Sequence, residues 1–326
     1  MNNEVFKCRI CNSGETNDWT FKEMMFGLRH EFKYKECTDC GCIQIEEYPK
    51  EMEDYYPQNY YAFSDSNFNQ LPGIGKKIKS SALLYNHLVF KDFVGRMGKK
   101  TFAPFRYKLQ YLERINLKPW SRILDVGCGN GRFLSVLFHM GFSNLTGIDK
   151  FISKDFALFN KVRVWKKGID DLTKKFDLIT LHHVFEHMPH QKNVLTSLYN
   201  KLNKKGTVII RIPVKNKAWE IYREHWVQID APRHFYLHTI NSFKLLAENT
   251  GFAVTKIDFD SYAFQFWGSE QYKLNIPLRN NERSYAENKQ TSIFTLQQLS
   301  DWENKSIEFN DNNLGDQAIF YLKKNE

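Results

Sequence analysis

The stretch that decides the fold is ILDVGCGNG at residues 123–131, an apolar run that leads into three glycines spaced two apart. An apolar run of this length predicts a buried strand, and the residues after Gly131 have the spacing of an amphipathic helix. Glycine is required in such a loop because a ligand must lie against bare backbone, where free amide groups and a helix amino terminus can bind it. The stretch therefore predicts a ligand-binding loop between a strand and a helix.

Around this loop, short apolar runs alternate with longer amphipathic stretches, a pattern typical of a parallel sheet flanked by helices. We predict seven strands, at residues 122–126, 145–148, 162–165, 176–181, 207–212, 253–259 and 318–322. Helices are predicted at 131–140, 191–202 and 239–250, the last two closed by residues 203–206 and by Gly251. The interval 262–316 is too long for a structureless loop and is expected to hold structure of its own. The predicted fold class is α/β with a seven-stranded, Rossmann-like sheet.

Acidic residues beside the loop narrow the kind of ligand. Asp125 lies inside the first strand, which suits a cationic ligand with a free amino group. Asp149 closes the second strand, where a carboxylate can accept both hydroxyls of a ribose. Ile169 and Asp170 follow the third strand and offer an apolar surface and an acceptor for an adenine amino group. The spacing also differs from the Gly-x-Gly-x-x-Gly of nicotinamide cofactor sites.

Residues 120–260 resemble the class I S-adenosylmethionine-dependent methyltransferases, whose motif is a hydrophobic residue followed by Leu-Asp-Val-Gly-Cys-Gly-x-Gly. The last predicted strand is similar to the seventh, antiparallel strand of that fold. The resemblance implies that S-adenosylmethionine is the cofactor, with Asp125 near its methionine amino group and Asp149 on its ribose. The alternative for Asp149 and Asp170 is that they are solvated loop acids. The other cofactor contacts that we predict are Gly127, Cys128, Gly129, Gly131, Lys150, Ile169, Asp170 and His182.

Four cysteines within the first forty residues form two Cys-x2-Cys pairs, Cys8 with Cys11 and Cys37 with Cys40. Paired thiolates at that spacing suit tetrahedral zinc, and four sulfurs complete the coordination, so the metal is expected to be structural. A region with few large apolar residues also needs such a cross-link. Residues 1–50 are therefore predicted to be a zinc ribbon.

Residues 51–118 separate the zinc ribbon from the sheet. A tyrosine- and asparagine-rich stretch at 51–70 predicts a linker, and helical spacing among lysines and arginines predicts two or three basic helices from Gly73 to about Pro119. Such helices pack on a core or contact an anionic membrane or nucleic acid. The expected domains are thus 1–50, 51–118 and 119–326, the last with an insertion at about 262–316.

The composition is that of a globular protein, with 42% hydrophobic and 25% charged residues and a mean hydropathy of −0.53. Neither a membrane-spanning apolar run nor a secretory leader is evident, so we expect the cytoplasm, or the inner face of the membrane, as the location. The formal net charge of +9 favours an anionic partner, unless it is ordinary solubilising charge.

Methyl transfer to a hydroxyl or a carbon acid needs a base, and the candidates follow the fourth and fifth strands, at residues 182–190 and 230–238. His187 is expected to begin a helix with its imidazole toward the substrate. His234 is the candidate base, and a structural hydrogen-bonding role is the alternative. A metal site among the histidines of the first cluster is the less favoured interpretation.

The segment that begins at Arg233 is similar to one in zinc-ribbon sugar methyltransferases, in which a histidine acts as base, and this resemblance implies that role for His234. That subfamily also has a tyrosine-rich segment after its zinc ribbon, which implies a catalytic role for Tyr60. Two departures are evident. Arg233 stands where the sugar C-methyltransferases have Glu, and the chain has no room for their third domain, so O- and C-methylation both stay open.

The sequence therefore favours a methyltransferase that acts on a nucleotide-linked or lipid-linked sugar, in polysaccharide or secondary-metabolite biosynthesis. A nucleic-acid methyltransferase ranks lower, because no Asn-Pro-Pro-Tyr-like tetrad follows the fourth strand. A third hypothesis is a catalytically weak module that binds S-adenosylmethionine. The intact glycine loop and Asp149 argue against it.

Overall fold

The structure is a computed structural model that describes residues 6–56, 111–112, 115–290 and 293–325. These residues divide into two compact units. The first contains 6–56, 185–192 and the described part of 211–320, and the second contains 111–112, 115–184, 193–210 and 321–325. Most of the predicted linker and nearly all of the basic helices that we expect before Pro119 lie outside the described residues.

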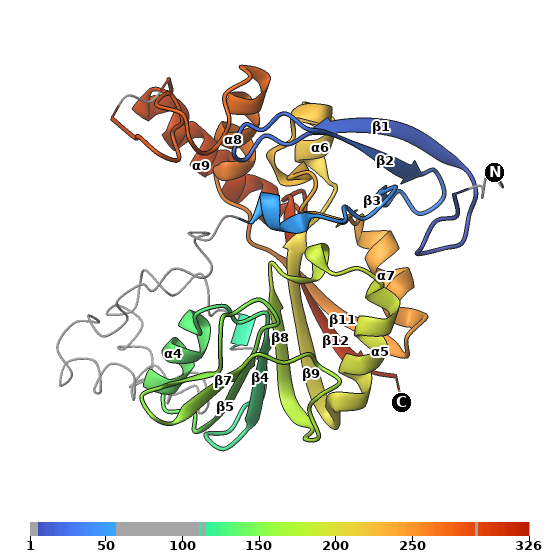
Figure 1. Ribbon diagram of the computed structural model, residues 1–326, viewed down its shortest axis with the longest axis vertical. Helices are drawn as coiled ribbons and strands as arrows, with labels where there is room; N and C mark the ends of the chain where they lie inside the picture. The colour runs from blue at the N-terminus through green and yellow to red at the C-terminus, as the bar shows by residue number, and fades with distance from the viewer. Residues whose placement is uncertain (1–5, 57–110, 113–114, 291–292, 326) are drawn as a thin grey trace. The chain divides into compact units, whose positions relative to one another are not determined.

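The second unit is built on parallel strands that lie side by side in Figure 1: β4 (Arg122–Val126), β5 (Asn144–Ile148), β7 (Val162–Trp165) and β8 (Phe176–His182). Strand β4 pairs with β5 on one side and β8 on the other, and β5 pairs with β7. Helix α4 (Arg132–His139) packs against β5 and β7. Because both neighbours of β4 come later in the chain, the direction of winding reverses there, and ligands of open α/β sheets bind at the carboxyl ends of such strands.

The larger sheet has eight strands, one more than predicted, in the order β11-β12-β9-β8-β4-β5-β7-β6. The additional strand, β6 (Phe156–Leu158), pairs antiparallel with β7. The turn between them places Phe159 and Asn160 at positive φ, of 53° and 55°. A strand of three residues is too short to show a period of two, so the sequence pattern missed it.

The remaining strands of this sheet are β9 (Leu202–Pro213), β11 (Phe252–Phe259) and β12 (Gln317–Lys324). Strand β9 begins five residues before its predicted start at 207, so the predicted closing turn at 203–206 is wrong. The side chain of Asn203 donates a hydrogen bond of 2.6 Å to Asp177 Oδ1 in β8, which holds this segment beside the neighbouring strand.

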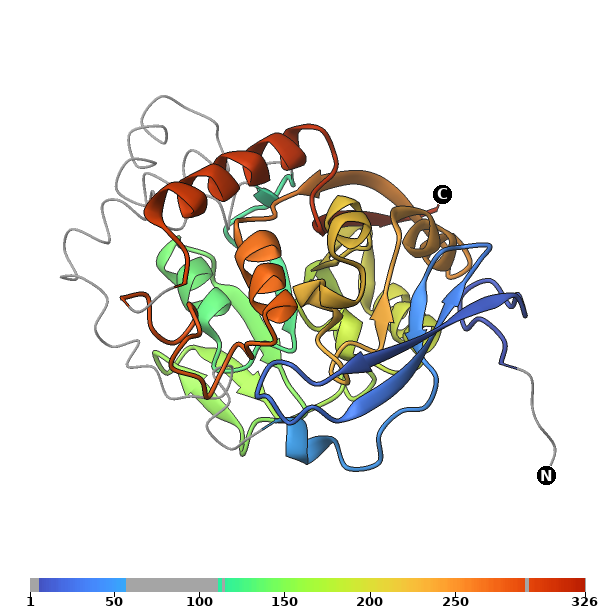
Figure 2. The same ribbon diagram turned by 90° about the horizontal axis from the view of Figure 1, so that it is seen from above.

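The predicted helices are present as α4, α5 (Gln191–Lys201) and α7 (Ile240–Glu248). Thr239 caps α7 and forms a capping box with Ser242, which fixes the start of that helix. The interval 262–316 contains α8 (Phe264–Lys273) and α9 (Leu296–Asp311), which pack against each other (Figure 2). No helix among the described residues is long and apolar enough to cross a membrane.

The first unit contains a smaller antiparallel sheet of β1 (Thr16–Lys22), β2 (Glu31–Cys37), β3 (Ile43–Ile45) and β10 (Tyr236–Leu237). Strand β10 is distant in sequence and pairs with β3. The Ile45 amide also donates to the Phe235 carbonyl at 2.9 Å. The cysteine-containing segment therefore shares a sheet with the residues that follow His234.

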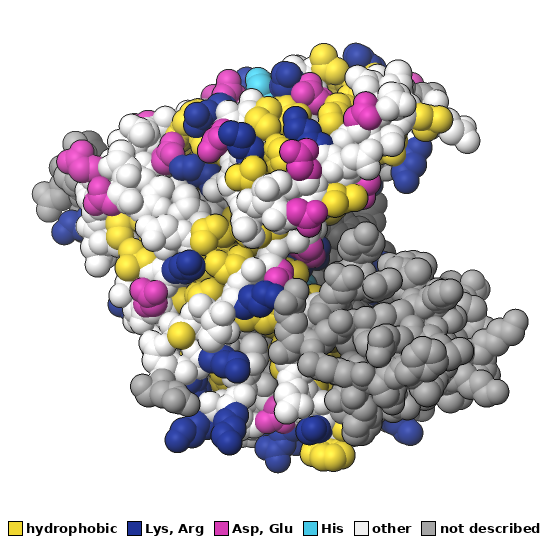
Figure 3. Space-filling model, turned by 180° about the vertical axis from the view of Figure 1, so that it is seen from behind, with side chains coloured by type: hydrophobic (Ala, Val, Ile, Leu, Met, Phe, Trp, Pro, Cys, Tyr) yellow, Lys and Arg dark blue, Asp and Glu magenta, His cyan; other side chains and the backbone are white. Residues whose placement is uncertain are grey.

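Buried tryptophans hold the rest of the first unit, among its short helices η1 (Met52–Tyr55), η4 (Phe185–His187), α6 (Lys217–Tyr222), η5 (Arg223–His225) and η6 (Val227–Ile229). Trp219 lies edge-on to Trp19 and to Trp226, with ring centroids 5.0 and 6.2 Å apart. Trp226 Nε1 donates to the buried Asp316 at 2.9 Å. In the upper part of Figure 3 acidic side chains lie among the basic ones, so the described residues form no continuous basic surface there.

Candidate functional site

The glycine loop after β4 has a backbone that only glycine adopts readily. Gly127, Gly129 and Gly131 have φ values of 68°, 51° and 76°. A Cβ on Gly127 would lie 2.5 Å from Val184 Cγ2, and one on Gly131 would lie 2.7 Å from Leu158 Cδ1. Both the conformation and the close packing therefore require glycine at these positions.

Asp149 holds the glycine loop against the end of β5. Its Oδ2 accepts a hydrogen bond of 3.0 Å from the Gly129 amide, and its Oδ1 accepts one of 2.8 Å from the Phe151 amide. The carboxylate is nearly buried. A carboxylate has about four acceptor sites, so two are left for the ribose hydroxyls that the sequence predicts.

Asp125 is buried in β4 and accepts a hydrogen bond of 2.8 Å from Thr180 Oγ1. Burial raises the pKa of Asp125 to about 7, against the lowering effect of Thr180 and with a smaller raising effect from Asp149. A raised carboxyl pKa means that the group is protonated in part at neutral pH. A cationic ligand beside it would favour the ionised form.

The structure places the other predicted cofactor residues around the same strand ends. The Cys128 sulfur packs on Gly147, where an added Cβ would lie 2.6 Å from it. The Lys150 side chain packs on Gly168 in the same way, at 2.8 Å. Ile169 is buried, whereas Asp170 is exposed. Its neighbour Asp171 accepts the Gly168 amide at 2.7 Å and so shapes this loop.

His182 ends β8 and belongs to an aromatic cluster that sequence reasoning missed. Its Nε2 lies 3.0 Å from Tyr111 Oη, and its ring meets Phe133 edge-on at 4.8 Å. Phe133 is the second residue of α4, directly after the glycine loop. Because Phe133 directly follows the glycine loop, its place near the cofactor site could be read from the sequence. The contact of Tyr111 with His182 could not.

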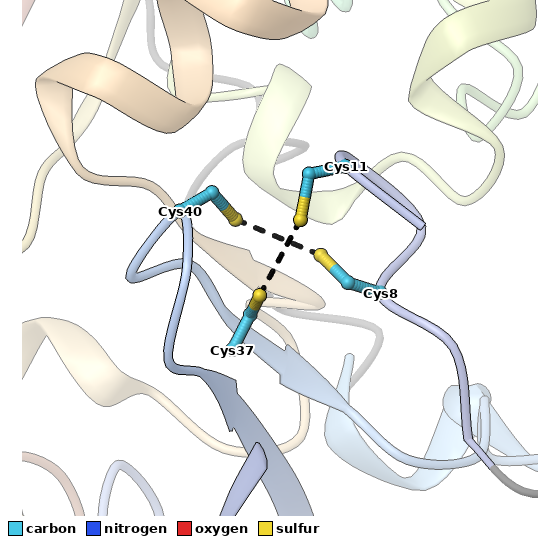
Figure 4. A group of neighbouring side chains, drawn as sticks. All are labelled: Cys8, Cys11, Cys37 and Cys40. Atoms are coloured by element: carbon cyan, nitrogen blue, oxygen red, sulfur yellow. Dashed lines mark hydrogen bonds between the residues drawn. The ribbon is translucent and has the colours of Figure 1, made fainter. Parts of the chain in front are cut away.

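The four cysteines form one cluster in the first unit, with their sulfur atoms turned toward one another (Figure 4). All four Sγ atoms lie within 4.8 Å of one another, and the pairs Cys8 with Cys40 and Cys11 with Cys37 are 3.6 and 3.4 Å apart. Zinc–sulfur bonds of about 2.3 Å give a tetrahedron with edges of about 3.8 Å. The arrangement therefore fits one tetrahedral metal ion.

Local turns present these sulfurs. Asn12 and Gly41, which follow the two cysteine pairs, have φ values of 63° and 73° and turn the chain back. Gln44 Nε2 donates to Cys8 Sγ at 2.9 Å, and the hydrogen bond to the Cys40 thiol holds the pKa of Cys8 well below that of an ordinary thiol. Donors aimed at a sulfur favour the thiolate, which is the form that binds metal.

The structure brings His187 and His234 together in the first unit. Their ring centroids are 4.7 Å apart. His187 Nδ1 lies 2.8 Å from the Arg233 carbonyl, and His234 Nδ1 lies 2.7 Å from the Gln228 carbonyl. A carbonyl oxygen only accepts, so Nδ1 of each ring carries a proton and Nε2 has the lone pair when the ring is neutral.

Arg233 fixes the loop that carries His234. The fully buried guanidinium makes two hydrogen bonds to Asp230, of 3.0 and 2.6 Å, and one of 3.1 Å to the buried Glu23. It also donates to the Tyr55 carbonyl at 3.2 Å. Burial alone raises the pKa of Asp230, but Arg233 outweighs it and lowers that pKa to about 2. No pattern in the sequence indicated that Glu23 and Asp230 are its partners.

His187 lies in the short helix η4 rather than at the start of a longer one, which corrects the prediction. Met188 bonds back to Phe185 at 3.1 Å, and the proline that follows Met188 disfavours helical backbone there. Burial, and to a smaller degree His234, lowers the pKa of His187 to about 4. Tyr56 Oη lies 3.2 Å from His187 Nδ1, whereas Tyr60 lies outside the described residues.

Residues 97–257 match the sequence model of a family described as "Methyltransferase domain", a stretch that contains the glycine loop, Asp149 and His234. The match supports a class I S-adenosylmethionine-dependent methyltransferase domain in this part of the chain. S-adenosylmethionine is accordingly the cofactor of this methyltransferase domain. The residues around the glycine loop fit it, because a carboxylate at the end of β5 and a buried carboxyl group lie beside glycines that carry no side chain.

The names of two curated relatives of the methyltransferase domain specify different methyl-accepting atoms, oxygen and nitrogen. The mitochondrial ubiquinone biosynthesis O-methyltransferase of Saccharomyces cerevisiae is 25% identical over 165 residues, which are 44% of this chain and 52% of the yeast protein. Phosphoethanolamine N-methyltransferase 1 of Zea mays is 25% identical over 186 residues, 54% of this chain and 36% of the maize protein. The chain thus spans about half or less of these relatives.

Among solved structures, the mycolic acid cyclopropane synthase CmaA1 complexed with SAH and CTAB is similar to this chain with a TM-score of 0.44 and 15% sequence identity. The similarity covers 78% of this chain and 100% of that one.

We expect Asp149→Ala to weaken the binding of S-adenosylmethionine roughly 10- to 100-fold, because it removes the acceptor that holds the glycine loop and a hydrogen bond to a charged group stabilises by about 1.5–3 kcal/mol. Isothermal titration calorimetry measures this. Asp155→Ala is the matched control, since Asp155 also accepts a backbone amide, at 2.7 Å, but on the exposed surface. Equal affinity of the Asp149 variant and the wild type would contradict the assignment.

Affinity for S-adenosylhomocysteine, which retains the amino group, should rise about tenfold between pH 6 and pH 8. Below its pKa of about 7 Asp125 is protonated and neutral, and above that pKa it offers the ligand a negative charge. Asp125→Asn keeps the shape of the side chain but removes the group that titrates. The affinity of this variant for S-adenosylhomocysteine should therefore be lower than that of the wild type at pH 8 and nearly independent of pH. Parallel pH profiles for the two proteins would rule out this role of Asp125.

Proposed function

We propose that this chain transfers a methyl group from S-adenosylmethionine to a sugar, nucleotide-linked or lipid-linked, in polysaccharide or secondary-metabolite biosynthesis. The observation that carries the proposal is the pair His187 and His234, whose Nδ1 protons are held by backbone carbonyls. The resulting free Nε2 is what a general base needs. An amine acceptor needs no such base once it is neutral, so the pair supports an oxygen or carbon nucleophile.

His234 is the residue that removes the acceptor's proton. Its Nε2 lies 3.8 Å from Asp230 Oδ2, so the imidazolium that forms gains a nearby carboxylate. The cofactor supplies an electrophilic methyl group on a sulfonium. The acceptor oxygen, or carbon, gives its proton to Nε2 and forms a bond to the methyl carbon, while the carbon–sulfur bond breaks and its electron pair stays on sulfur. The products are the methylated acceptor and S-adenosylhomocysteine.

His187 and the tyrosine-rich segment complete the acceptor side of this proposal. His187 contacts the ring of His234 and Tyr56 Oη, and Tyr56 begins the segment that leads to Tyr60. The resemblance to zinc-ribbon sugar methyltransferases supports a sugar acceptor. In the upper part of the face drawn in Figure 3 acidic side chains lie among the basic ones, which gives no support to a nucleic-acid acceptor there.

We expect His234→Asn to lower kcat by roughly 10²- to 10⁴-fold, the usual contribution of a general base, with the affinity for S-adenosylmethionine unchanged. Formation of S-adenosylhomocysteine with a panel of nucleoside-diphosphate and lipid-linked sugars gives the rate. His190→Asn, an exposed histidine that follows η4, serves as the control. Methyl transfer to RNA but to no sugar would contradict the acceptor class, and near-normal turnover by the His234 variant would contradict the base.

The four-cysteine cluster is a structural zinc site in this proposal. Four thiolate ligands leave a tetrahedral ion no open position for substrate. The metal therefore stabilises the fold and takes no part in catalysis. Two hydrogen bonds join the surroundings of the cluster to the segment around His234. Thr239 Oγ1, at the start of α7, donates to the Cys40 carbonyl at 2.8 Å, and Tyr34 Oη, in the strand that ends at Cys37, donates to the His234 carbonyl at 3.0 Å.

The Cys40→Ala variant should lose zinc and unfold at a temperature lower by roughly 5 °C or more, since a kcal/mol corresponds to about 2–4 °C at this size. Metal analysis after gel filtration with a weak chelator, together with thermal unfolding, provides the measurement. The control is Cys42→Ala, a buried cysteine beside the cluster that is not among its four ligands. A Cys40 variant that kept its full zinc content would show that the cysteines do not bind it.

A further inference from the structure

Glu186, His187 and His234 bring three metal-binding side chains together in the first unit. One nitrogen of each ring and one carboxylate oxygen of Glu186 all lie within 4.8 Å of one another. Glu186 is fully buried and His234 is nearly so. The first two residues come from η4 and the third from the loop after η6, so only the folded chain assembles the group.

Backbone carbonyls hold both rings as they are held in metal sites. A histidine that binds a metal almost always donates its other ring N–H to a carbonyl or carboxylate, which orients the ring and fixes the tautomer. Here the carbonyls are those of Arg233 and Gln228, at 2.8 and 2.7 Å. The supporting interactions of a metal site are therefore already present.

Carboxylates gather near the two rings. Arg233 forms ion pairs with Glu23 and Asp230, and Glu186 is fully buried. Buried carboxylates are stabilised by cations and by hydrogen bonds.

We infer that Glu186, His187 and His234 bind a divalent transition-metal ion such as Zn²⁺, Co²⁺ or Ni²⁺, in competition with the proton that His234 accepts. Two imidazoles and one carboxylate are the donors that these ions prefer. Bonds of about 2.1 Å place donor atoms about 3.4 Å apart in a tetrahedral site, so donor atoms at the 4.8 Å limit must approach each other by about 1.4 Å. Only the competition rests on the proposed function.

The test is a titration of the zinc-loaded protein with Co²⁺, without cofactor or acceptor, followed by calorimetry and visible absorption. We expect one further Co²⁺ per chain, with ligand-field bands of nitrogen and oxygen donors and no thiolate charge-transfer band. Glu186→Gln and His187→Asn should each weaken this binding at least about 100-fold, because each removes a direct ligand. His190→Asn is the matched control, and thermal unfolding checks that each variant is folded.

Three results would overturn the inference: no Co²⁺ beyond the cysteine site, a thiolate charge-transfer band for the added ion, or unchanged binding by both folded ligand variants. Turnover is measured separately. Added Co²⁺ should slow methyl transfer by the wild type and a chelator should restore it, whereas acceleration would contradict the competition. A protein that binds the second Co²⁺ but methylates no sugar would refute the proposed function and leave the metal site intact.

Discussion

A guanidinium with no exposed surface lies within the first unit, and its burial requires acceptors from three parts of the chain. Arg233 bonds to Asp230 in its own loop, to Glu23 after β1 and to the Tyr55 carbonyl at the end of η1. Removing any one partner would leave a buried charge poorly compensated, which is strongly destabilising. The N-terminal segment and the loop that carries His234 are therefore fixed together by one side chain.

The position of both histidines follows from this constraint. The Arg233 carbonyl accepts from His187, and the Gln228 carbonyl, in the preceding η6, accepts from His234. Strand β10 then pairs with β3 in the sheet whose strand β2 ends at Cys37. In the proposed enzyme the zinc site stabilises the smaller sheet. That sheet contains β10, which directly follows the loop with the proposed base His234.

The predicted cofactor site around the glycine loop depends on residues that lie close together in the sequence. Asp149 accepts the amides of Gly129 and Phe151 and so joins the glycine loop to the end of the next strand, and the three glycines adopt positive φ. Asp125, buried with Thr180, adds a carboxyl group whose ionisation is poised near neutral pH. Short segments around one strand provide all of these parts.

The sequence by itself determined the features whose cause is local. Apolar runs predicted the parallel strands, Gly127 to Gly131 predicted the loop, and the spacing of Cys8, Cys11, Cys37 and Cys40 predicted their cluster, since each depends on residues close in the chain or on a strongly patterned motif. It missed β6, which is too short to show a period, and misjudged the start of β9. Only the tertiary structure decided that Arg233 is buried between Asp230 and Glu23, that Tyr111 meets His182, and that His187 faces His234. Apart from the pair Arg233 and Asp230, which lie three residues apart, those contacts join segments tens to hundreds of residues apart. No local pattern encodes which distant partner a buried polar side chain will find.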